Sequence, residues 1–409
     1  MMKIKPHKVF YSVSFFQFFM REITGTTLIL FLLSKGLSLE TSNYLLVIYF
    51  LSVFLFEVPT GAIADKYGRK ISVVLGLICF LIYSIFFMQA NELWLLIFAQ
   101  IFGGLAICLQ SGALESWVVE TSEHSVEDLF TTANSIQYIS GIFCGLLGAL
   151  LATYHYSLPW IVSIISTIIT ITLCLCFMNE NNTIARHNAN SNLLIIIRES
   201  VRIGINNKAI WIIFFIGLFI SFSNSAGNTF QQPRLVGLSE QGIWIMGIIK
   251  AAYSLCMTLG SYLIRKLYRK YSDIYILMLS CAMIGIWLTL AGALNSFYPV
   301  LVTFLIYEVG RGMYPAAKQI FLNKRISNEY RSTLLSLDSA ISQLGMCIGL
   351  IVTGIISRKF INIKSDQAPI QISWIICGGI ALIPIVLLLL FKINTKGNRQ
   401  LIGNQNFKS

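Results

Sequence analysis

Nine charged side chains interrupt segments of this sequence that are otherwise apolar. A charge at membrane depth is costly unless it is paired or faces water, so each such residue is a candidate for pairing, ligand binding or proton transfer. Glu308 and Arg311 are three residues apart, a spacing that lets them pair on one helix face. Whether that pair fixes the structure or takes part in function stays open. The nine residues are Arg21, Glu22, Glu57, Glu115, Lys250, Glu308, Arg311, Lys318 and Asp338.

Arg21 lies about a dozen residues into its apolar segment, or roughly 18 Å at 1.5 Å per residue, which is near the middle of a bilayer. Its expected partner is Glu57 or Glu115. Glu57 has a second interpretation as a proton carrier, because burial penalises the charged form of a carboxyl. Near the segment ends we expect Glu115 and Lys318 to extend toward water. We expect Asp338 to cap its helix or to pair locally with Lys318.

Polar side chains without charge gather in segment 209–233. Asn224 and Asn228 are the candidates there for lining a polar cavity, and Gln137 is a further candidate in segment 129–153. Amides that converge on a mixed aromatic and charged cavity suit an amphiphilic organic molecule better than a sugar or an inorganic ion.

The elements that must position these residues follow from composition. Of 409 residues, 56% are hydrophobic and 12% are charged, against roughly 25% charged residues in an ordinary soluble domain. A membrane-spanning helix needs about 20 apolar residues. The sequence therefore predicts an all-α integral membrane protein with twelve spans. These are 8–33, 41–64, 71–89, 93–119, 129–153, 158–178, 209–233, 241–263, 274–292, 297–322, 332–357 and 369–392.

Lysine and arginine gather at alternate connections between these spans. Because such residues collect on the cytoplasmic side, both termini are expected in the cytoplasm. Anionic lipid and this asymmetry account for the net charge of +12, so no nucleic-acid partner is needed. The predicted organisation is a six-helix bundle (1–178), a cytoplasmic linker (179–208) with an amphipathic run at 193–203, a second six-helix bundle (209–392) and a cytoplasmic tail (393–409).

The two predicted bundles resemble one another. Gly141 and Gly145 in the fifth span are matched by Gly345 and Gly349 in the eleventh. Small residues at four-residue spacing let helices approach closely in lipid, so the match predicts similar packing in both halves. A duplicated six-helix unit is a common plan for alternating access.

The connection between the second and third spans carries the most specific motif. It contains Gly61, Asp65, Gly68, Arg69 and Lys70 in the pattern GxxxDxxGRK, which resembles the signature loop of the major facilitator superfamily. Gly68 permits a tight turn, and Gly61 permits a close approach of helices. Asp65 has the spacing to pair with Arg69. The resemblance implies the fold of that superfamily, with twelve transmembrane helices in two pseudo-symmetric six-helix bundles.

The resemblance also implies a gate. In that family the aspartate at the position of Asp65 faces the eleventh helix, which carries Asp338 here, and the contact latches the outward-facing state. The alternative is a short basic loop with no gating role. The matching loop of the second half, 260–273, keeps its basic residues but loses the aspartate spacing, so we expect an asymmetric gate.

Family resemblance gives the expected activity. Helices one, four, seven and ten line the central cavity in this superfamily, and helices one, four and ten carry six of the nine charges. The run from Phe56 to Thr60 resembles a subgroup of bacterial drug and natural-product exporters. The antiporter signature is partial, because Gln100 stands where an arginine is usual and the fifth span lacks the proline.

We expect the protein to be a proton-coupled antiporter that exports a drug-like or peptide-derived amphiphilic compound. Such efflux is associated with antibiotic resistance. Uptake by a proton symporter is the alternative, and a polytopic membrane enzyme or sensor is the alternative of another class.

No Walker motif is present, so the proton gradient is the expected energy source and no cofactor is expected. The four histidines are scattered and the nine cysteines lie in spans without a CxxC pair, so no metal is expected and the cysteines are interpreted as packing residues. The expected partners are a small organic substrate and the bilayer, and the expected state is a monomer in the bacterial cytoplasmic (inner) membrane. Aromatic residues near span ends are expected to be interface anchors. They are Trp94, Trp160, Tyr298 and Trp374.

Overall fold

The computed structural model describes residues 5–179, 208–325, 331–360 and 367–405. In these ranges every regular element is an α-helix, as predicted. Ten helices there are long and apolar enough to cross a membrane, or eleven when a bent pair at the start of the chain counts as one span. α13 (Phe297–Asn323), which carries the three charged residues Glu308, Arg311 and Lys318, is not among the ten. With α13 included, all twelve predicted segments are helical over most of their length.

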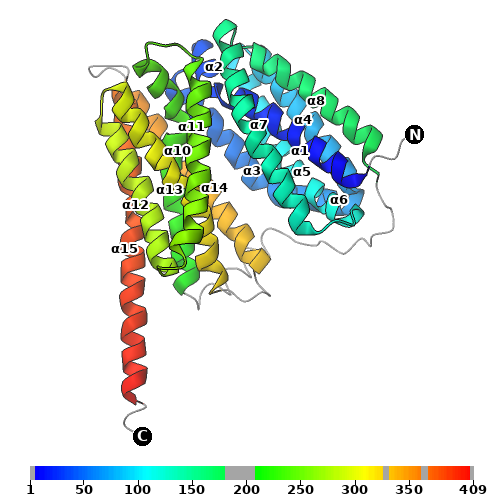
Figure 1. The fold of residues 1–409 in the computed structure, drawn as a ribbon. Coiled ribbons are helices and arrows are strands. Elements are labelled where there is room, and N and C mark those ends of the chain that lie inside the picture. Colours follow the sequence, from blue (N-terminus) through cyan, green and yellow to red (C-terminus); the bar gives the residue numbers. More distant parts are fainter. Residues whose placement is uncertain (1–4, 180–207, 326–330, 361–366, 406–409) are drawn as a thin grey trace. The chain divides into compact units, whose positions relative to one another are not determined.

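The chain forms two compact units, and unit 1 is built on the N-terminal helices (Figure 1). It comprises Met1–Ile195 together with Thr229–Ser254 from farther along the chain. The helices of its first part are α1 (Pro6–Gly25), α2 (Leu28–Ser34), α3 (Leu39–Tyr67), α4 (Arg69–Gln89), α5 (Leu93–Gln110), α6 (Ala113–Thr121), α7 (Val126–Tyr154) and α8 (Leu158–Phe177). α1 packs against α7 and α8, and α4 packs against α5 and α8.

Unit 2 comprises Ile196–Asn228 and Leu255–Ser409. Two helices are divided between the units, so that the first part of α10 and the second part of α11 belong to unit 2. The helices of this unit are α10 (Lys208–Leu238), α11 (Ile245–Leu267), α12 (Asp273–Ala293), α13, α14 (Arg331–Phe360) and α15 (Ala368–Gln405). α12 lies between α13 and α15 and packs against both (Figure 1).

Local sequence sets several helix ends. Ser38 caps α3, because its side chain accepts a hydrogen bond from the Thr41 backbone N–H. Gly68 separates α3 from α4 with a φ of 107°, which confirms the predicted tight turn. Gly112, with a φ of 71°, separates α5 from α6. The predicted span 93–119 is found as one apolar span, Leu93–Thr121, but it consists of two helices that meet at this left-handed glycine.

The first predicted span is also broken. α1 and α2 meet at 45° across Thr26 and Thr27. A break leaves backbone groups without helical partners, and these must be satisfied in an apolar environment. The side chain of Gln232 does so, because its Oε1 accepts from the Ile29 N–H at 2.9 Å and its Nε2 donates to the Gly25 carbonyl at 2.9 Å. A residue of α10 thus fixes the bend within unit 1.

The predicted match of Gly141 and Gly145 with Gly345 and Gly349 does not extend to their contacts, because the first two meet side chains of Phe18 and Lys250 and the last two meet backbone of α10. Each unit nevertheless has a close glycine contact with a neighbouring backbone. A Cβ at Gly148 of α7 would lie 2.3 Å from the Ile23 carbonyl oxygen of α1. On α14, a Cβ at Gly349 would lie 2.5 Å from the Phe222 carbonyl oxygen of α10. Each helix therefore approaches its neighbour's backbone so closely that only glycine fits.

Three helix boundaries differ from the sequence prediction. α10 continues through Pro233 to Leu238, so Arg234, expected in a connection, lies inside the helix and is 1% exposed. α11 begins at Ile245 rather than near 241, after a turn at Gly242. α15 continues to Gln405, into the segment expected to be a tail. The linker predicted at 179–208, with its amphipathic run, lies almost wholly outside the described residues.

Candidate substrate and coupling residues

Six of the nine predicted charged residues form three ion pairs in the two units. The pairs are Glu22 with Lys250 (2.6 Å), Glu308 with Arg311 (2.9 Å) and Asp338 with Lys318 (2.7 Å). The first pair lies in unit 1, and the other two lie in unit 2. Pairing lowers the cost of placing charge at membrane depth, and the six side chains are 0–26% exposed.

Each cation of these pairs also lies over a tyrosine ring. Lys250 Nζ is 5.0 Å from the centroid of the Tyr253 ring, and the Arg311 guanidinium carbon is 5.6 Å from that of Tyr307. Lys318 Nζ lies 5.7 Å from the Tyr314 centroid. A desolvated cation gains from the electron-rich face of an aromatic ring. The three clusters therefore share one construction of carboxylate, cation and tyrosine.

The Glu308–Arg311 pair confirms the local pairing predicted from the i, i+3 spacing. Glu308 is fully buried and receives two hydrogen bonds from Arg311 Nη1, at 2.9 and 3.2 Å. The neighbouring Tyr307 hydroxyl donates to Asn224 Oδ1 at 3.2 Å. One predicted cavity residue of α10 thus lies beside this pair, and Asn228 is half-buried one turn farther along the same helix.

The Lys318–Asp338 pair confirms one of the two interpretations of Asp338 and corrects that of Lys318. Lys318 does not extend to water, because its side chain is 12% exposed and its amine contacts Asp338. A Cβ at Gly217 would lie 2.8 Å from that amine, so α10 also closes over the pair. Asp338 lies seven residues after the start of α14 and does not cap it.

Arg21 lacks an ion pair with any carboxylate among the described residues. Its Nε donates to the Gln17 backbone oxygen at 2.9 Å, one turn earlier on α1. Tyr49, Glu22 and Glu115 are the groups close enough to act on its charge. The side chain is half-buried. The predicted salt bridge to Glu57 or Glu115 is therefore wrong, because Glu115 acts on the charge of Arg21 from beyond ion-pair distance and Glu57 does not act on it.

Glu57 is half-buried on α3 and likewise makes no ion pair with the described residues. Pro59 follows two residues later inside the same helix, where it removes a backbone donor. The Thr60 hydroxyl bonds to the carbonyl oxygens of Phe56 and Glu57 at 2.8 and 3.1 Å. The carboxylate therefore lies on a turn whose regular hydrogen bonding is interrupted. The last cavity candidate, Gln137, is half-buried on α7.

The predicted gating loop is engaged within unit 1. Arg69 forms an ion pair with Glu120 at the end of α6 (3.6 Å), and Lys70 Nζ donates to the Leu175 oxygen of α8 at 2.9 Å. Inside unit 1 a Cβ at Gly61 would meet no described atom within 4 Å, so Gly61 is not required for packing in this unit and its role in the gate stays a prediction. The side chain of Asp65 lies outside what the structure describes, so its predicted contacts stay predictions.

The matching loop of unit 2 uses the opposite arrangement of charge. Asp273, in the first turn of α12, pairs with Arg325 just after α13. In unit 1 the cation Arg69 is at the start of α4 and the carboxylate Glu120 is at the end of α6. In unit 2 the carboxylate Asp273 is at the start of α12, which corresponds to α4, and the cation Arg325 follows α13. The expected asymmetry between the loops therefore includes a reversal of charge.

Two tryptophans expected as interface anchors are core residues instead. Trp160 is 1% exposed and stacks on Phe87 at 4.7 Å. Trp374 is fully buried and donates its indole N–H to the Ala226 oxygen at 3.0 Å. Trp94 and Tyr298, at 64% and 71% exposed, are consistent with anchors. Of the nine cysteines, seven are buried, all nine are free, and the described residues hold no group of three or more potential metal ligands.

Sequence reasoning passed over Arg234 and gave Gln232 no specific role. Arg234 lay beyond the expected end of its span, so no signal marked it. Gln232 was visible as one of several amides in the segment, but the backbone break that it satisfies was not.

Comparisons with known proteins agree with this architecture. The family model described as Major Facilitator Superfamily matches residues 10–350 and 236–406. An uncharacterized MFS-type transporter, YxaM of Bacillus subtilis (strain 168), is 25% identical over 393 residues, which cover 93% of this chain and 94% of that protein.

Two solved structures share the fold. The crystal structure of the nucleoside transporter NupG has a TM-score of 0.81 at 14% identity and covers 95% of this chain and 99% of that one. The crystal structure of a D-xylose-proton symporter has a TM-score of 0.69 at 13% identity and covers 93% and 95%. With the family model matching most of the chain, this protein belongs to the major facilitator superfamily and is a multi-pass secondary transporter.

Proposed function

We propose that this transporter exports an amphiphilic organic compound with an anionic group in exchange for protons. Arg21 binds the anionic group, and Glu57 carries the proton. One observation carries the proposal. Of the charged residues that lie away from the ends of the predicted spans, Arg21 and Glu57 are the two without an ion-pair partner among the described residues.

Arg21 supports the substrate half of the proposal. A charged group at membrane depth costs several kcal/mol when it is not compensated, so a cation without a carboxylate partner is expensive to retain. An anionic substrate would supply the missing charge. The guanidinium also offers a planar fork of donors that matches a carboxylate or phosphate in two parallel hydrogen bonds. Tyr49, the first of the groups acting on Arg21, adds an aromatic surface for the apolar part of the compound.

Glu57 supports the proton half. Because no cation holds its charge, the carboxyl can change protonation without leaving an opposite charge uncompensated. Its place beside Pro59 puts it on a turn that can change conformation with little loss of hydrogen bonding. Glu22, Glu308 and Asp338 are each held by a cation, so protonating any of them would strand a buried positive charge. We therefore assign these three pairs a structural role, in which Glu22–Lys250 and Lys318–Asp338 each join two helices and Glu308–Arg311 neutralises charge within α13.

The proposal also covers the topology, the membrane, the oligomeric state and the energy source of the transporter. Lysine and arginine at alternate connections favour cytoplasmic termini, and the relative from Bacillus subtilis favours a bacterial cytoplasmic membrane. A monomer suffices, since the proposed substrate and proton residues both lie in unit 1. No cofactor is required, because the proton gradient supplies the energy.

The test uses everted membrane vesicles with an imposed pH gradient, acid inside, and a panel of amphiphilic carboxylic acids such as N-octanoyl amino acids. Export predicts that the vesicles accumulate at least one of the acids and that dissipating the gradient releases it. In Glu57→Gln the gradient should no longer drive accumulation, while exchange of labelled for unlabelled compound should persist. The exposed carboxylate Glu123 provides the control, because it is not among the groups that act on Arg21 and Glu123→Gln should leave both activities unchanged.

Uptake by proton symport is the second candidate. The shared fold with a protein described as a D-xylose-proton symporter favours it. The same vesicles separate the two directions, since a symporter would accumulate compound in right-side-out vesicles when the outside is acidic. Accumulation only in that orientation would overturn export and retain the proposed roles of Arg21 and Glu57.

A further inference from the structure

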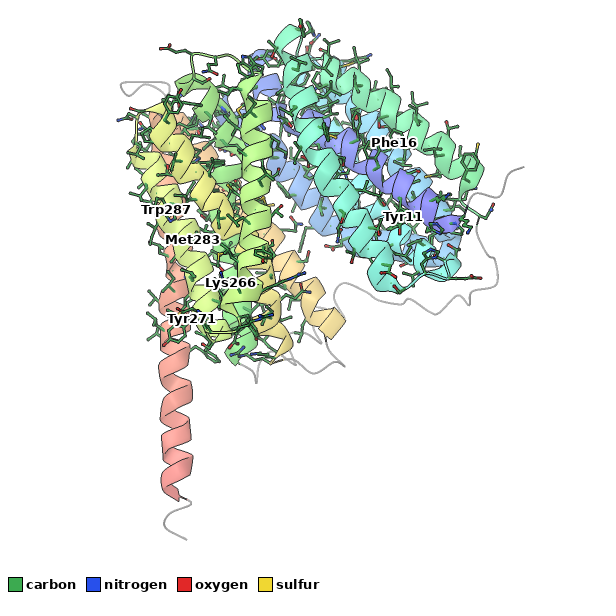
Figure 2. The ribbon with its side chains drawn as sticks, viewed as in Figure 1. Tyr11, Phe16, Lys266, Tyr271, Met283 and Trp287 are labelled. Carbon is green, nitrogen blue, oxygen red and sulfur yellow. The ribbon has the colours of Figure 1, made fainter. Side chains whose placement is uncertain are left out.

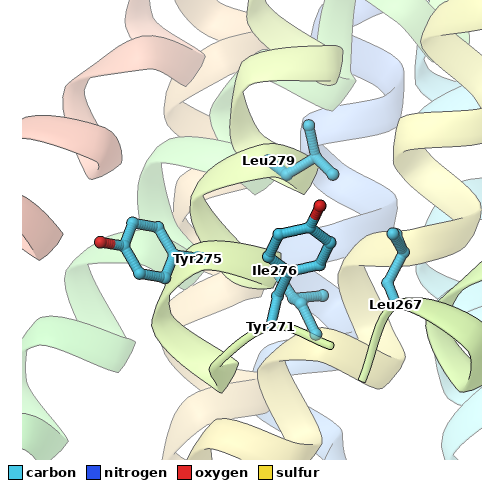
Figure 3. Close-up of a pocket in the computed structure, with 5 residues that line it drawn as sticks. All are labelled: Leu267, Tyr271, Tyr275, Ile276 and Leu279. Atoms are coloured by element: carbon cyan, nitrogen blue, oxygen red, sulfur yellow. The ribbon is translucent and has the colours of Figure 1, made fainter. Parts of the chain in front are cut away.

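A cavity of about 410 Å³ opens on unit 2 where α11 turns into α12. It is lined by apolar side chains and two tyrosines, shown in Figure 3 as Leu267, Tyr271, Tyr275, Ile276 and Leu279. In that view the Tyr271 ring rises from the turn between Leu267 and Leu279. Tyr271, Tyr275 and Leu279 are 56%, 48% and 42% exposed. The cavity is therefore open at the surface rather than closed inside the helices.

The apolar cavity continues into one face of α12. Tyr275, Leu279, Ile286 and Leu290 are 41–48% exposed, and their spacings of four, seven and four residues place them along one side of the helix. Figure 2 shows Tyr271 at the turn and Met283 and Trp287 farther along α12. An exposed apolar face on a membrane-spanning helix faces acyl chains. The cavity is thus the end of a lipid-facing surface.

Basic residues surround the polar end of the same cavity. Arg265 and Lys266 end α11, and Arg269 and Lys270 stand directly before Tyr271. All four are exposed. None makes an ion pair with a carboxylate in the described ranges. Figure 2 places Lys266 and Tyr271 at the same end of the α11–α12 hairpin.

Little negative charge offsets this cluster. Between residues 255 and 293 the sequence has one acidic residue, Asp273, and that carboxylate is paired with Arg325. Lys324, whose Nζ lies 4.8 Å from the Tyr268 ring centroid, adds a further exposed cation beside the turn. The neighbouring Tyr268 raises the pKa of Lys324, so this exposed amine is charged at neutral pH.

We propose that this cavity binds one anionic phospholipid, with an acyl chain along Leu279 and the exposed face of α12 and with the phosphate on Arg269 and Lys270. Dimensions agree with that occupant. One leaflet of the hydrocarbon core is about 15 Å thick, which corresponds to roughly ten residues of α12 at 1.5 Å each. That length runs from Tyr275 to about Ile284. Basic pockets on the cytoplasmic side, where the distribution of lysine and arginine predicts this turn, suit anionic headgroups.

The test is native mass spectrometry of the full chain, purified in detergent and then given an equal mixture of dioleoyl phosphatidylglycerol and dioleoyl phosphatidylcholine. We expect one phosphatidylglycerol molecule to remain bound in preference to phosphatidylcholine. Arg269→Gln/Lys270→Gln should reduce that preference about tenfold or more, since each basic residue near the membrane surface contributes about 1 kcal/mol. The matched control Lys8→Gln/Lys359→Gln removes two exposed charges elsewhere and should leave the preference unchanged.

A second variant tests the cavity itself. Leu279→Trp should fill it and reduce retention of both lipids, and because Leu279 is 42% exposed, the change should not prevent folding. Equal retention of the two lipids by the wild type would overturn the proposal. So would an unchanged preference in Arg269→Gln/Lys270→Gln, or unchanged retention in Leu279→Trp. A lipid-free dimer that Leu279→Trp dissociates would assign the cavity to a second copy of the chain instead.

Discussion

In unit 2 the four predicted charges on α13 and α14 each have an opposite charge within 3 Å, whereas in unit 1 Arg21 and Glu57 have none within 4 Å among the described residues. Unit 1 contains one such pair, Glu22–Lys250, whose lysine comes from α11. Both units contain glycines in close contact with a neighbouring backbone, such as Gly148 and Gly349, but the units differ in how their charges are paired. Charges that are neutralised hold a scaffold, and charges left without partners are available to ligand and proton.

The largest expected loss of stability comes from removing the cation of the Glu308–Arg311 pair. The comparison between the units would fail if removing Arg21 cost as much. Arg311→Met leaves Glu308 fully buried without its cation, which should lower the free energy of unfolding by about 3–5 kcal/mol. Arg21→Met should change it by less than about 1 kcal/mol, since no carboxylate is stranded. Thermal unfolding in detergent measures both. Adding Glu308→Gln to Arg311→Met should recover much of the loss, and equal losses for the two single variants would contradict the comparison.

Glycine packing tests what the units share. Gly349→Ala places a Cβ 2.5 Å from the Phe222 backbone oxygen, so α14 must move from α10 at a cost of about 1–3 kcal/mol. Gly148→Ala meets the Ile23 oxygen at 2.3 Å and should cost a similar amount. Gly61→Ala has open space and serves as the control, with no loss expected. Unfolding temperatures of the three variants decide this, and a loss at Gly61 equal to the other two would argue against the assigned contacts.

The reversed ion pairs of the two loops give the smallest effects. The Arg69 and Glu120 side chains are 26% and 31% exposed, so Glu120→Gln should change the free energy of unfolding by about 0–1 kcal/mol. The Asp273 side chain is 10% exposed, so Asp273→Asn should cost more, about 1–3 kcal/mol. The difference between the two variants should persist or widen in 1 M salt, because salt screens the exposed Arg69–Glu120 pair more than the buried Asp273–Arg325 pair. A larger effect at Glu120 would reverse this ranking.

Hydropathy predicted the helices well because it reports which residues lie at membrane depth. Local signals located the turn at Gly68 and the pairing of Glu308 with Arg311, which depend on neighbours in sequence. Hydropathy did not predict which way a side chain faces, because the rotation of a helix about its axis is set by packing against other helices. Trp160 and Trp374 lie near helix ends yet are buried for that reason.

The partners of distant charges were also beyond sequence reasoning. Lys250 contacts Glu22 although 228 positions separate them, and Arg21 lacks the expected carboxylate although two were suggested by depth alone. Proline misled the prediction at Pro233, where α10 continues and encloses Arg234. A proline is tolerated in a membrane helix when neighbouring groups satisfy the freed backbone.

Counterflow in proteoliposomes tests the central claim most directly, since it needs no gradient and is indifferent to direction. Proteoliposomes containing the purified full chain are loaded with an unlabelled N-octanoyl amino acid or with its methyl ester. Entry of the same compound in labelled form is then followed. We predict that the acid exchanges and the ester does not, that Arg21→Gln slows exchange of the acid about a hundredfold, and that Arg21→Lys retains part of it. Equal exchange of acid and ester, or unchanged exchange in Arg21→Gln, would show that Arg21 is not the residue that binds the substrate.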